Sequence, residues 1–321
     1  MKINQDSTIL ITGGTGSFGI AFLEKLLSIK VKEIRIFSRD EKKQSDLRIR
    51  FPQSFIKFYI GDVRDRDSLI DAMHHVDVVF HAAALKQVPT LENFPIEATK
   101  TNVIGTDNVL SVAVQQHVKQ VIVLSTDKSI QPISAMGLTK ALMEKSVLAK
   151  AKNYLTPIIN IVRYGNVLAS RGSVVPLFID AVKLNKPITL HNPDSSRFII
   201  TMQEAIELVL FAIEKGKQGE IFVPKTQSAT LSMIYQSLEK ILNKKAKLNL
   251  SNLRQGDKLH EQLIETDEYP YTRLEHNIYI IDGLKRSSPL QTTIQPLFSN
   301  QVLMSESKLE SLLKNIVKNL D

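Results

Sequence analysis

The sequence predicts an α/β fold in which a doubly wound parallel sheet carries a smaller C-terminal lobe. Short apolar runs alternate with longer helical patterns through the first half of the chain. This alternation is typical of right-handed strand–helix–strand units. The predicted strands are apolar nearly throughout, as expected when helices cover both faces of a parallel sheet. A glycine-rich turn also follows the first strand directly, as it does in many sheets of this class.

The predicted elements follow one another regularly as far as residue 162. β-Branched and apolar runs predict strands at residues 8–11, 33–37, 56–60, 76–80, 121–124 and 158–162. Amphipathic patterns predict helices between them, including 18–28, 65–74 and 95–117. From Arg163 onward the alternation gives way to loops and scattered helices. The second half therefore predicts a smaller lobe, interleaved with the last strands of the sheet.

Three regions follow from this division. We expect a nucleotide-binding domain at residues 1–165, a substrate-binding lobe at 166–285 and a tail at 286–321. Residues 305–320 of the tail place leucine and isoleucine near helical spacing, with lysines between them. This pattern predicts an amphipathic helix, packed either on the core or on a neighbouring subunit.

The composition excludes several classes of protein. The 321 residues are 43% hydrophobic and contain no cysteine, so disulfides and thiolate metal sites are excluded and no metal site is predicted. The net charge is +8, but the lysines are scattered and not interleaved with aromatic residues, which argues against nucleic acid. No apolar run approaches the roughly 20 residues that span a bilayer, and no signal pattern precedes the first strand. We expect a cytoplasmic protein without membrane insertion.

Three glycines after the first strand predict a dinucleotide site. Gly13, Gly16 and Gly19 are evenly spaced, and they open the helix that follows. Glycines at this spacing allow a tight turn, close approach of the backbone to a pyrophosphate, and close packing of helix on strand. The amide groups at the helix N-terminus would then point at the phosphates.

The end of the second predicted strand indicates which dinucleotide binds. Ser38, Arg39, Lys42 and Lys43 would suit the 2′-phosphate of NADP, so NADP is favoured over NAD. Asp40 complicates this assignment because a carboxylate there could bind the ribose of NAD. We prefer to interpret Asp40 as the N-cap of the next helix.

A set of longer segments carries a family resemblance. They are ILITGGTGSFG, FSRDEKKQ, FYIGDVRD, HAAALKQVP, KTNVIGTDNVL, LSTDKSIQPISAMGLTKALMEK, RYGNVLASRGSVVPLF and RQGDKLHE, between Ile9 and Glu261. Together they resemble the extended short-chain dehydrogenases/reductases that act on nucleotide sugars, which have the Rossmann fold. The greatest similarity is to the UDP-N-acetylglucosamine 4,6-dehydratases that invert C5.

The resemblance implies an NADP-dependent lyase. It would convert UDP-N-acetylglucosamine to UDP-2-acetamido-2,6-dideoxy-β-L-arabino-hex-4-ulose, for bacterial capsule polysaccharide or another surface glycan. The nicotinamide would take a hydride from C4 and return it to C6, while protein groups move the protons. The resemblance also implies a homo-oligomer, namely a hexamer.

The candidate catalytic residues follow the fifth predicted strand. The resemblance implies that Lys128 is the C5 base, with a lowered pKa, and that Asp127 is the acid for the C6 oxygen, with a raised pKa. It implies that Thr126 hydrogen-bonds the C4 oxygen and that Lys140 holds the nicotinamide ribose. Met136 stands where short-chain dehydrogenases have a catalytic tyrosine, one helical turn before Lys140. A thioether carries no proton, and this replacement occurs in the capsule branch of the group.

The remaining binding residues also follow from the resemblance. The cofactor would contact Gly13, Thr15, Gly16, Ser17, Phe18, Gly19, Ser38, Arg39, Asp40, Lys42, Lys43, Asp62, Val63, Ala82, Ala83, Ala84, Lys86, Asn102, Ser125 and Lys140. The UDP-sugar would contact Lys86, Asn166, Ser170, Arg171, Gly172, Ser173, Val174, Val175, Arg197, Arg254 and Asp257. Arg171, Arg197 and Arg254 could each donate two hydrogen bonds to the pyrophosphate, or they could form surface ion pairs.

Two alternatives stay open at this point. One is another nucleotide-sugar enzyme of the same family, either a 4-epimerase or a dehydrogenase. An epimerase normally uses the phenol to move the O4 proton, so Met136 argues against it. The other is a non-catalytic NADP-binding scaffold, against which the presence of both Asp127 and Lys128 argues. Which group removes the O4 proton without a tyrosine is also open.

Overall fold

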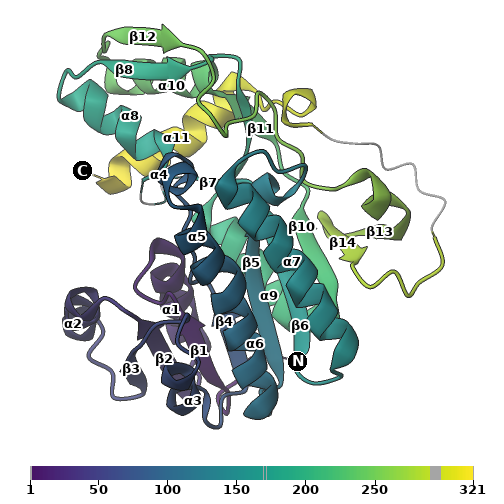
Figure 1. Ribbon diagram of the computed structural model, residues 1–321. Coiled ribbons are helices and arrows are strands. Elements are labelled where there is room, and N and C mark those ends of the chain that lie inside the picture. Colours follow the sequence, from purple (N-terminus) through teal and green to yellow (C-terminus); the bar gives the residue numbers. More distant parts are fainter. Residues whose placement is uncertain (1, 169, 171, 290–297, 321) are drawn as a thin grey trace.

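A nine-stranded sheet forms the centre of the molecule (Figure 1). The structure is a computed structural model that describes residues 2–168, 170, 172–289 and 298–320. The strand order is β13-β14-β10-β6-β5-β4-β1-β2-β3, parallel except at the edge, where β14 pairs antiparallel with both β10 and β13. The strands are β1 (Thr8–Thr12), β2 (Glu33–Ser38), β3 (Ile56–Ile60), β4 (Val78–His81), β5 (Gln120–Thr126), β6 (Ile158–Tyr164), β10 (Glu220–Pro224), β13 (Thr272–Glu275) and β14 (Ile278–Asp282). The predicted doubly wound α/β class is confirmed.

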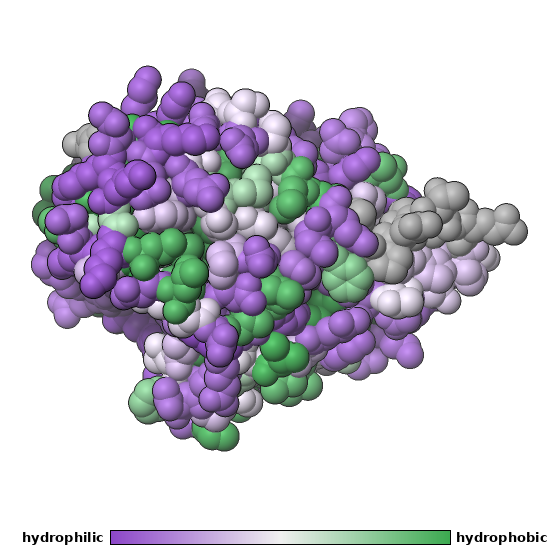
Figure 2. All heavy atoms as spheres, turned by 90° about the horizontal axis from the view of Figure 1, so that it is seen from above, coloured by the Kyte–Doolittle hydropathy of each residue, from purple (hydrophilic) through white to green (hydrophobic). Residues whose placement is uncertain are grey.

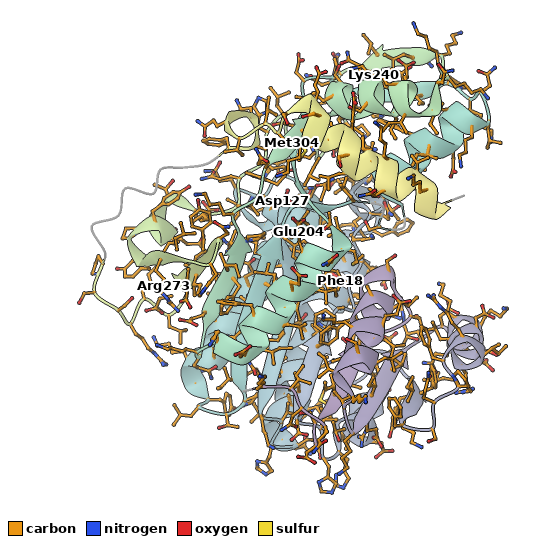
Figure 3. The ribbon with its side chains drawn as sticks, turned by 180° about the vertical axis from the view of Figure 1, so that it is seen from behind. Phe18, Asp127, Glu204, Lys240, Arg273 and Met304 are labelled. Atoms are coloured by element: carbon orange, nitrogen blue, oxygen red, sulfur yellow. The ribbon has the colours of Figure 1, made fainter. Side chains whose placement is uncertain are left out.

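Helices cover both faces of this sheet, which explains why its strands are apolar on both sides. Figure 1 shows α6 and α7 in front of the sheet, and Figure 3, from behind, shows α9 and α1 on the other face. One face packs against α1 (Ser17–Ile29), α2 (Glu41–Arg50) and α9 (Met202–Lys215). The other packs against α3 (Asp67–Met73), α6 (Gly105–Gln115) and α7 (Ala135–Asn153). Two short helices, α4 (Val88–Asn93) and α5 (Pro95–Ala98), follow β4.

A lobe with its own apolar core lies beyond the carboxyl end of the sheet (Figure 1). It contains a three-stranded sheet in the order β11-β9-β7 and the parallel pair β12-β8. Its strands are β7 (Asn166–Val167), β8 (Ile188–His191), β9 (Ser196–Ile200), β11 (Ser228–Thr230) and β12 (Leu248–Ser251). Its helices are α8 (Val174–Lys183), α10 (Leu231–Leu242) and α11 (Glu306–Leu320). The region predicted as one lobe thus also supplies β10, β13, β14 and α9 to the central sheet.

The tail helix packs on this lobe. Leu309, Leu313 and Val317 of α11 are buried together with Met304 and with Leu238 of α10. Of the two predicted packings, the structure therefore has the one on the chain's own core.

The long helix predicted at 95–117 is interrupted. A wide π-helical turn at Thr99–Ile104 separates α5 from α6. The buried Asn102 lies within this turn, and its amide nitrogen donates to the carbonyl of Leu85 while its carbonyl accepts from the Leu85 amide. Turns of this type are frequent at functional sites, and this one fixes the loop that follows β4.

The described surface is mostly hydrophilic. Figure 2, seen from above, shows hydrophilic side chains spread over the face, with small hydrophobic patches between them. Among the helices of the described residues, none is both long and apolar enough to cross a membrane.

Candidate functional site

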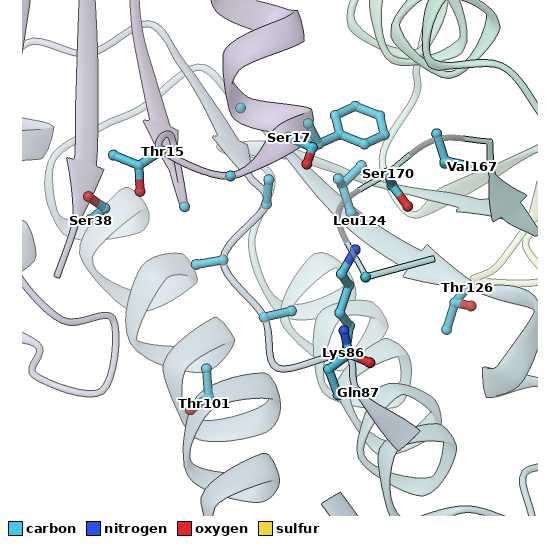
Figure 4. A pocket seen from close by; sticks show the side chains of 18 of the residues that line it. Thr15, Ser17, Ser38, Lys86, Gln87, Thr101, Leu124, Thr126, Val167 and Ser170 are labelled. Atoms are coloured by element: carbon cyan, nitrogen blue, oxygen red, sulfur yellow. The ribbon is translucent and has the colours of Figure 1, made fainter. Parts of the chain in front are cut away.

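A cavity of about 760 Å³ opens at the carboxyl ends of the central strands. Ligands of doubly wound sheets bind at this edge. In Figure 4, Thr15 and Ser38 lie toward one end of the cavity, Thr126 and Val167 lie toward the other, and Lys86 is between them. The predicted residues that line it are Gly13, Thr15, Gly16, Ser17, Phe18, Gly19, Ser38, Arg39, Asp40, Lys43, Asp62, Val63, Ala82, Ala83, Ala84, Lys86, Ser125, Thr126, Lys128, Met136, Lys140, Asn166, Ser170, Gly172 and Ser173.

The glycine turn after β1 is packed too closely for side chains. Gly13 has a φ of +66°, and a Cβ there would come within 2.8 Å of the Ala83 backbone. A Cβ on Gly19 would come within 2.5 Å of Gly14. Gly16 precedes the first turn of α1, so the backbone amides at the start of that helix lie at the cavity wall. Such a cradle fits the phosphates of a dinucleotide.

Cations and carboxylates alternate where the second ribose would lie. Asp40 caps α2, since its Oδ1 accepts from the Lys43 amide at 2.9 Å, as predicted. The Lys43 Nζ lies 2.5 Å from the other Asp40 oxygen, and Arg39 Nη1 lies 3.5 Å from Asp62. Arg39 and Lys43 are about half exposed, so both ammonium and guanidinium groups could turn toward a 2′-phosphate.

Two predicted cofactor contacts do not line the cavity. Lys42 points outward, is 81% exposed, and pairs with Asp46 one turn along α2. Asn102 is fully buried and donates to Thr139 Oγ1 as well as to the Leu85 carbonyl. Lys42 failed as a prediction because its position on α2 turns it away from the strand end. Asn102 instead supports the loop that contains Lys86.

The candidate catalytic residues form the end of β5 and the short 3₁₀ turn after it, Asp127–Ser129. Figure 3 shows Asp127 at the end of the sheet that faces the lobe. Asp127 Oδ1 accepts from Thr126 Oγ1 at 2.9 Å and from Lys128 Nζ at 3.1 Å. Ser129 Oγ donates to the Thr126 carbonyl at 2.7 Å and to Glu144 at 2.9 Å. The turn is therefore held by hydrogen bonds on both sides.

Asp127 does not reach the cavity directly, which corrects its predicted role as an acid in contact with the sugar. It is 0% exposed, and its contacts with the cavity run through Thr126 and Lys128, which both line the wall. The predicted direction of its pKa shift is confirmed, because burial raises the pKa of Asp127 even though Lys128 acts in the opposite direction.

The predicted lowering of the Lys128 pKa is wrong. Burial does lower it, but the carboxylates of Asp127 and Glu261 outweigh burial and raise the pKa of Lys128 above its ordinary value. The Nζ atom lies 3.1 Å from Asp127 Oδ1 and 3.2 Å from Glu261 Oε1. In this arrangement Lys128 is an ammonium group.

Glu261 is the acidic residue that the sequence reasoning missed. It is 1% exposed and comes from the segment after β12, far from Lys128 in the sequence. Lys258 Nζ lies 3.1 Å from Glu261 Oε2, and Arg197 Nε lies 4.0 Å from Oε1. Burial acts to raise the pKa of Glu261, but Lys128, Lys258 and Arg197 lower it to about 2. Glu261 is thus an ionised carboxylate held beside the turn Asp127–Ser129, which is called the catalytic turn below because it carries the candidate catalytic residues.

Lys140, unlike Lys128, has a lowered pKa. It lines the cavity at the start of α7, and its Nζ donates to the Leu124 carbonyl at 2.8 Å. Burial lowers the pKa of Lys140 to about 8. Met136, one turn earlier, is 4% exposed and packs against Val88, Leu91 and Ala98 while one side of it faces the cavity. Near neutral pH, Lys140 is therefore within reach of its uncharged form.

Several predicted sugar-nucleotide contacts point elsewhere. Arg197 donates to the carbonyls of Ser196 and Leu259 and faces Glu261 rather than the cavity. Arg254 pairs with Asp257 at 2.8 Å, and neither residue lines the cavity. Arg254 thus follows the surface ion-pair alternative stated for it, whereas Arg197 is buried and follows neither alternative.

Two further positions fail, and one is untested. Val174 does not line the cavity, and Val175 is 1% exposed in the core of the lobe, because both lie on α8 behind Ser173. Arg171 lies outside the described residues.

Other lining residues were not predicted. They are Phe37, Gly61, Gln87, Thr101, Leu124, Tyr164, Gly165, Val167 and Met202. Tyr164 ends β6 and Gly165 follows it directly, so the rule that ligands gather at carboxyl strand ends could have identified both residues. Met202 opens α9 and comes from the second half of the chain, where no sequence pattern indicated it.

The family comparison matches most of the chain. Residues 9–282 match the model of a family described as "Polysaccharide biosynthesis protein". A protein named UDP-glucose 4-epimerase from Rickettsia typhi is 52% identical over 270 residues, which cover 82% of this chain and 79% of that protein. A protein of the same name from Rickettsia canadensis is 49% identical over 269 residues, with the same coverage.

Solved structures of related fold agree with the architecture. Pen from Bacillus thuringiensis superposes with a TM-score of 0.92 at 33% identity, covering 97% of this chain and 98% of that one. DesIV, a dTDP-glucose 4,6-dehydratase from Streptomyces venezuelae, superposes with a TM-score of 0.71 at 21% identity, covering 78% and 86%. The Thermus thermophilus UDP-glucose 4-epimerase gives a TM-score of 0.69 at 20% identity, covering 78% and 88%. At these lower identities the likeness shows the fold alone, a doubly wound α/β sheet.

Proposed function

This chain belongs to the polysaccharide biosynthesis protein family, and on that premise we propose that it is a UDP-N-acetylglucosamine 4,6-dehydratase that inverts C5. The broader activity, an enzyme that acts on a nucleotide sugar, is supported by the family match and by relatives named for such an activity. One observation carries the finer proposal. Three proton-carrying groups, on Thr126, Asp127 and Lys128, are joined at one end of the cavity, and Met136 occupies the position of the usual phenol.

NADP is the proposed cofactor. The glycine cradle at Gly13 and Gly19 fits a pyrophosphate, and Arg39 and Lys43 fit a 2′-phosphate. When bound, the nicotinamide accepts the C4 hydride and returns it to C6. Several fold relatives are solved with NAD, so the choice between the two nucleotides is part of the proposal. If it is correct, Arg39→Ala weakens NADP binding at least tenfold more than NAD binding in fluorescence titrations; equal losses would favour NAD.

Lys140 is the proposed acceptor of the O4 proton. Its burial at the cavity wall and its pKa of about 8 place a neutral amine within reach near neutral pH. A general base is most effective when its pKa lies near the working pH. No phenol is needed for this step, which accounts for Met136.

The Asp127–Lys128 pair carries the proposed elimination. Lys128 Nζ and Asp127 Oδ1 are 3.1 Å apart, so the two groups titrate as a pair. The elimination requires the form of the pair in which Asp127 holds a proton and Lys128 has given one up to solvent. The Lys128 amine can then take the C5 proton, and the Asp127 carboxylic acid can protonate the departing C6 hydroxyl. Asp127 is buried, so its proton would reach the sugar through the Thr126 hydroxyl, 2.9 Å away. Because the two groups are coupled, their titrations belong to the pair.

The product decides the proposal. The NADP-loaded enzyme would be incubated with UDP-N-acetylglucosamine in heavy water, and the product examined by NMR. We expect a 4-keto-6-deoxy sugar with deuterium at an inverted C5, because C5 is reprotonated from solvent. A product without deuterium, or with retained C5 configuration, would overturn the C5-inverting assignment. Lys128→Ala and Asp127→Asn should each lower turnover at least a hundredfold while NADP stays bound.

A 4-epimerase is the second candidate, because relatives at about half identity carry the name UDP-glucose 4-epimerase. Such an enzyme returns the hydride to C4 and leaves C5 and C6 untouched. It would need Lys140 to move the O4 proton in both directions. UDP-glucose incubated in heavy water would then give UDP-galactose without deuterium, and the Asp127→Asn variant would stay active.

A further inference from the structure

Glu261 contacts three cations, and no role of the proposed mechanism uses it. Its carboxylate lies 3.2 Å from Lys128, 3.1 Å from Lys258 and 4.0 Å from Arg197. It is 2% exposed at the side chain, so water screens these interactions little. A carboxylate buried this deeply keeps its charge only when cations surround it. The arrangement makes Glu261 a permanent negative charge beside the catalytic turn.

The backbone holds this charge in place. The Glu261 amide donates to Ser299 Oγ at 2.9 Å, and the Ser299 amide donates to the Glu261 carbonyl at 2.9 Å. Ser299 Oγ in turn donates to the carbonyl of Ser196 in β9 at 3.0 Å. The segment is thus fixed between the lobe sheet and the C-terminal part of the chain. Glu261 has little freedom to follow Lys128 or to move away from it.

Two carboxylates therefore lie beside the Lys128 ammonium, although one of them would be enough to balance its charge. Asp127 Oδ1 and Glu261 Oε1 lie at nearly equal distances from its Nζ, 3.1 and 3.2 Å. The other Asp127 oxygen, Oδ2, is buried and has no hydrogen-bond partner among the described residues. Glu261 Oε2 also has no hydrogen-bond partner there, but it lies 3.1 Å from the Lys258 ammonium, whereas no ion pair among the described residues reaches Asp127 Oδ2. A neutral, protonated Asp127 therefore costs less to bury than an ionised one.

We propose that Glu261 is a positioning residue that serves as the fixed counter-ion of Lys128 and so leaves the Asp127 carboxyl free to hold a proton. The charged groups that face Glu261 are Lys128 and Asp127 from the catalytic turn, Arg197 from β9, and Lys258 from its own segment. Without Glu261, Asp127 alone would balance Lys128 and would stay ionised. The use made of that proton rests on the proposed function; its presence on Asp127 does not.

The test follows the Asp127 proton directly, without substrate. The NADP-loaded enzyme, labelled with ¹³C at the aspartate carboxyl carbon, would be titrated by NMR, and Asp127→Asn would identify the signal. We expect the wild-type signal to titrate above the ordinary aspartate value of about 3.9. In Glu261→Gln we expect its pKa to fall by about one unit, a tenfold loss of proton affinity. Glu261→Asp, which keeps the charge, should restore most of the shift.

Glu265→Gln is the matched control. Glu265 lies in the same segment, but it accepts from the Gln131 amide and caps the next helical turn rather than pairing with Lys128. This variant should leave the Asp127 titration unchanged. A Glu261→Gln variant with an unchanged or raised Asp127 pKa would overturn the proposal. If that variant does not fold, a wild-type Asp127 signal at or below the ordinary value would overturn it equally.

A second measurement separates this inference from the proposed reaction. If the enzyme is a dehydratase, the alkaline limb of its pH–rate profile should move to lower pH in Glu261→Gln, because Asp127 loses its proton earlier. If no dehydration occurs at all, the proposed function fails, but the NMR titration still decides the role of Glu261.

Discussion

At the scale of single residues, the neighbouring carboxylates give Lys128 and Lys140 opposite pKa shifts. Among the described residues, no carboxylate lies within hydrogen-bond distance of Lys140, whose Nζ donates to a backbone carbonyl and contacts Met143 Sδ at 3.4 Å. Burial therefore lowers its pKa to about 8, with Glu144 opposing the shift only in part. Lys128 is equally buried but faces two carboxylates, so its pKa is raised. Opposed shifts of neighbouring groups are how one site supplies both acid and base.

The lowered pKa of Lys140 predicts a pH-dependent stability. The folded state binds this proton less tightly than the unfolded state, whose lysine has an ordinary pKa of 10.5. The cost of the buried ammonium is therefore fully present below about pH 8, and it is relieved as pH rises from about 8 to 10.5, where the unfolded state also loses the proton. Lys140→Met should remove this part of the pH dependence and lower turnover at least a hundredfold. Urea unfolding at several pH values between 7 and 10 measures the first effect; parallel curves for both proteins would contradict it.

At the scale of elements, one buried arginine joins three segments behind the site. Arg163 of β6 is 1% exposed, and it pairs with Glu144 of α7 at 2.6 Å and with Glu268 of the short helical turn at Thr266–Tyr271 at 2.8 Å. Glu144 also accepts from Ser129 in the catalytic turn. Arg163 thus holds the carboxylate that supports Asp127–Ser129. Fixed supports of this kind keep reacting groups in place.

Removing this arginine should be costly. Arg163→Met leaves Glu144 and Glu268 buried without their cation, and breaking a buried pair in this way costs about 3–5 kcal/mol. The denaturation midpoint measures the loss. Arg50→Met is the matched control, because Arg50 and its partner Glu24 are both exposed, at 58% and 45%; its loss should cost less than about 1 kcal/mol. Equal losses of stability in the two variants would show that the buried ion pairs of Arg163 contribute no more than an exposed pair.

The same elements show what could be predicted from the sequence. The glycine turn, the strand ends and the N-cap Asp40 depend on neighbours close in the chain, so local patterns indicated them correctly. The pKa direction of Lys128 was wrong because its second carboxylate, Glu261, comes from the other half of the chain. Arg197 was placed on the pyrophosphate for the same reason, since its partners come from the segment of Leu259 and Glu261. Spacing alone does not reveal such long-range ion pairs.

At the scale of the whole molecule, the cavity is lined by both the central sheet and the lobe, which have separate hydrophobic cores. Its phosphate end is built by the glycine turn and the strand ends of the central sheet, whereas Ser170, Gly172 and Ser173 come from the segment that leads into α8 of the lobe. The lobe core includes Leu309 and Leu313 of α11, both 0% exposed. The tail helix therefore stabilises the lobe segment at Ser170, Gly172 and Ser173, where we propose that the sugar binds. The predicted hexamer stays a prediction.

Weakening this helix should separate the two binding functions. Each buried leucine truncated to alanine costs about 2–5 kcal/mol, so Leu309→Ala with Leu313→Ala should loosen the lobe while the central sheet keeps its own packing. We expect UDP binding to fall at least tenfold and NADP binding to change less than threefold, as measured by calorimetry. Leu312, only partly buried on the same helix, provides the control through Leu312→Ala. If both ligands are lost together, the lobe and the sheet unfold as one unit, and the predicted division of the chain into separate binding regions is wrong.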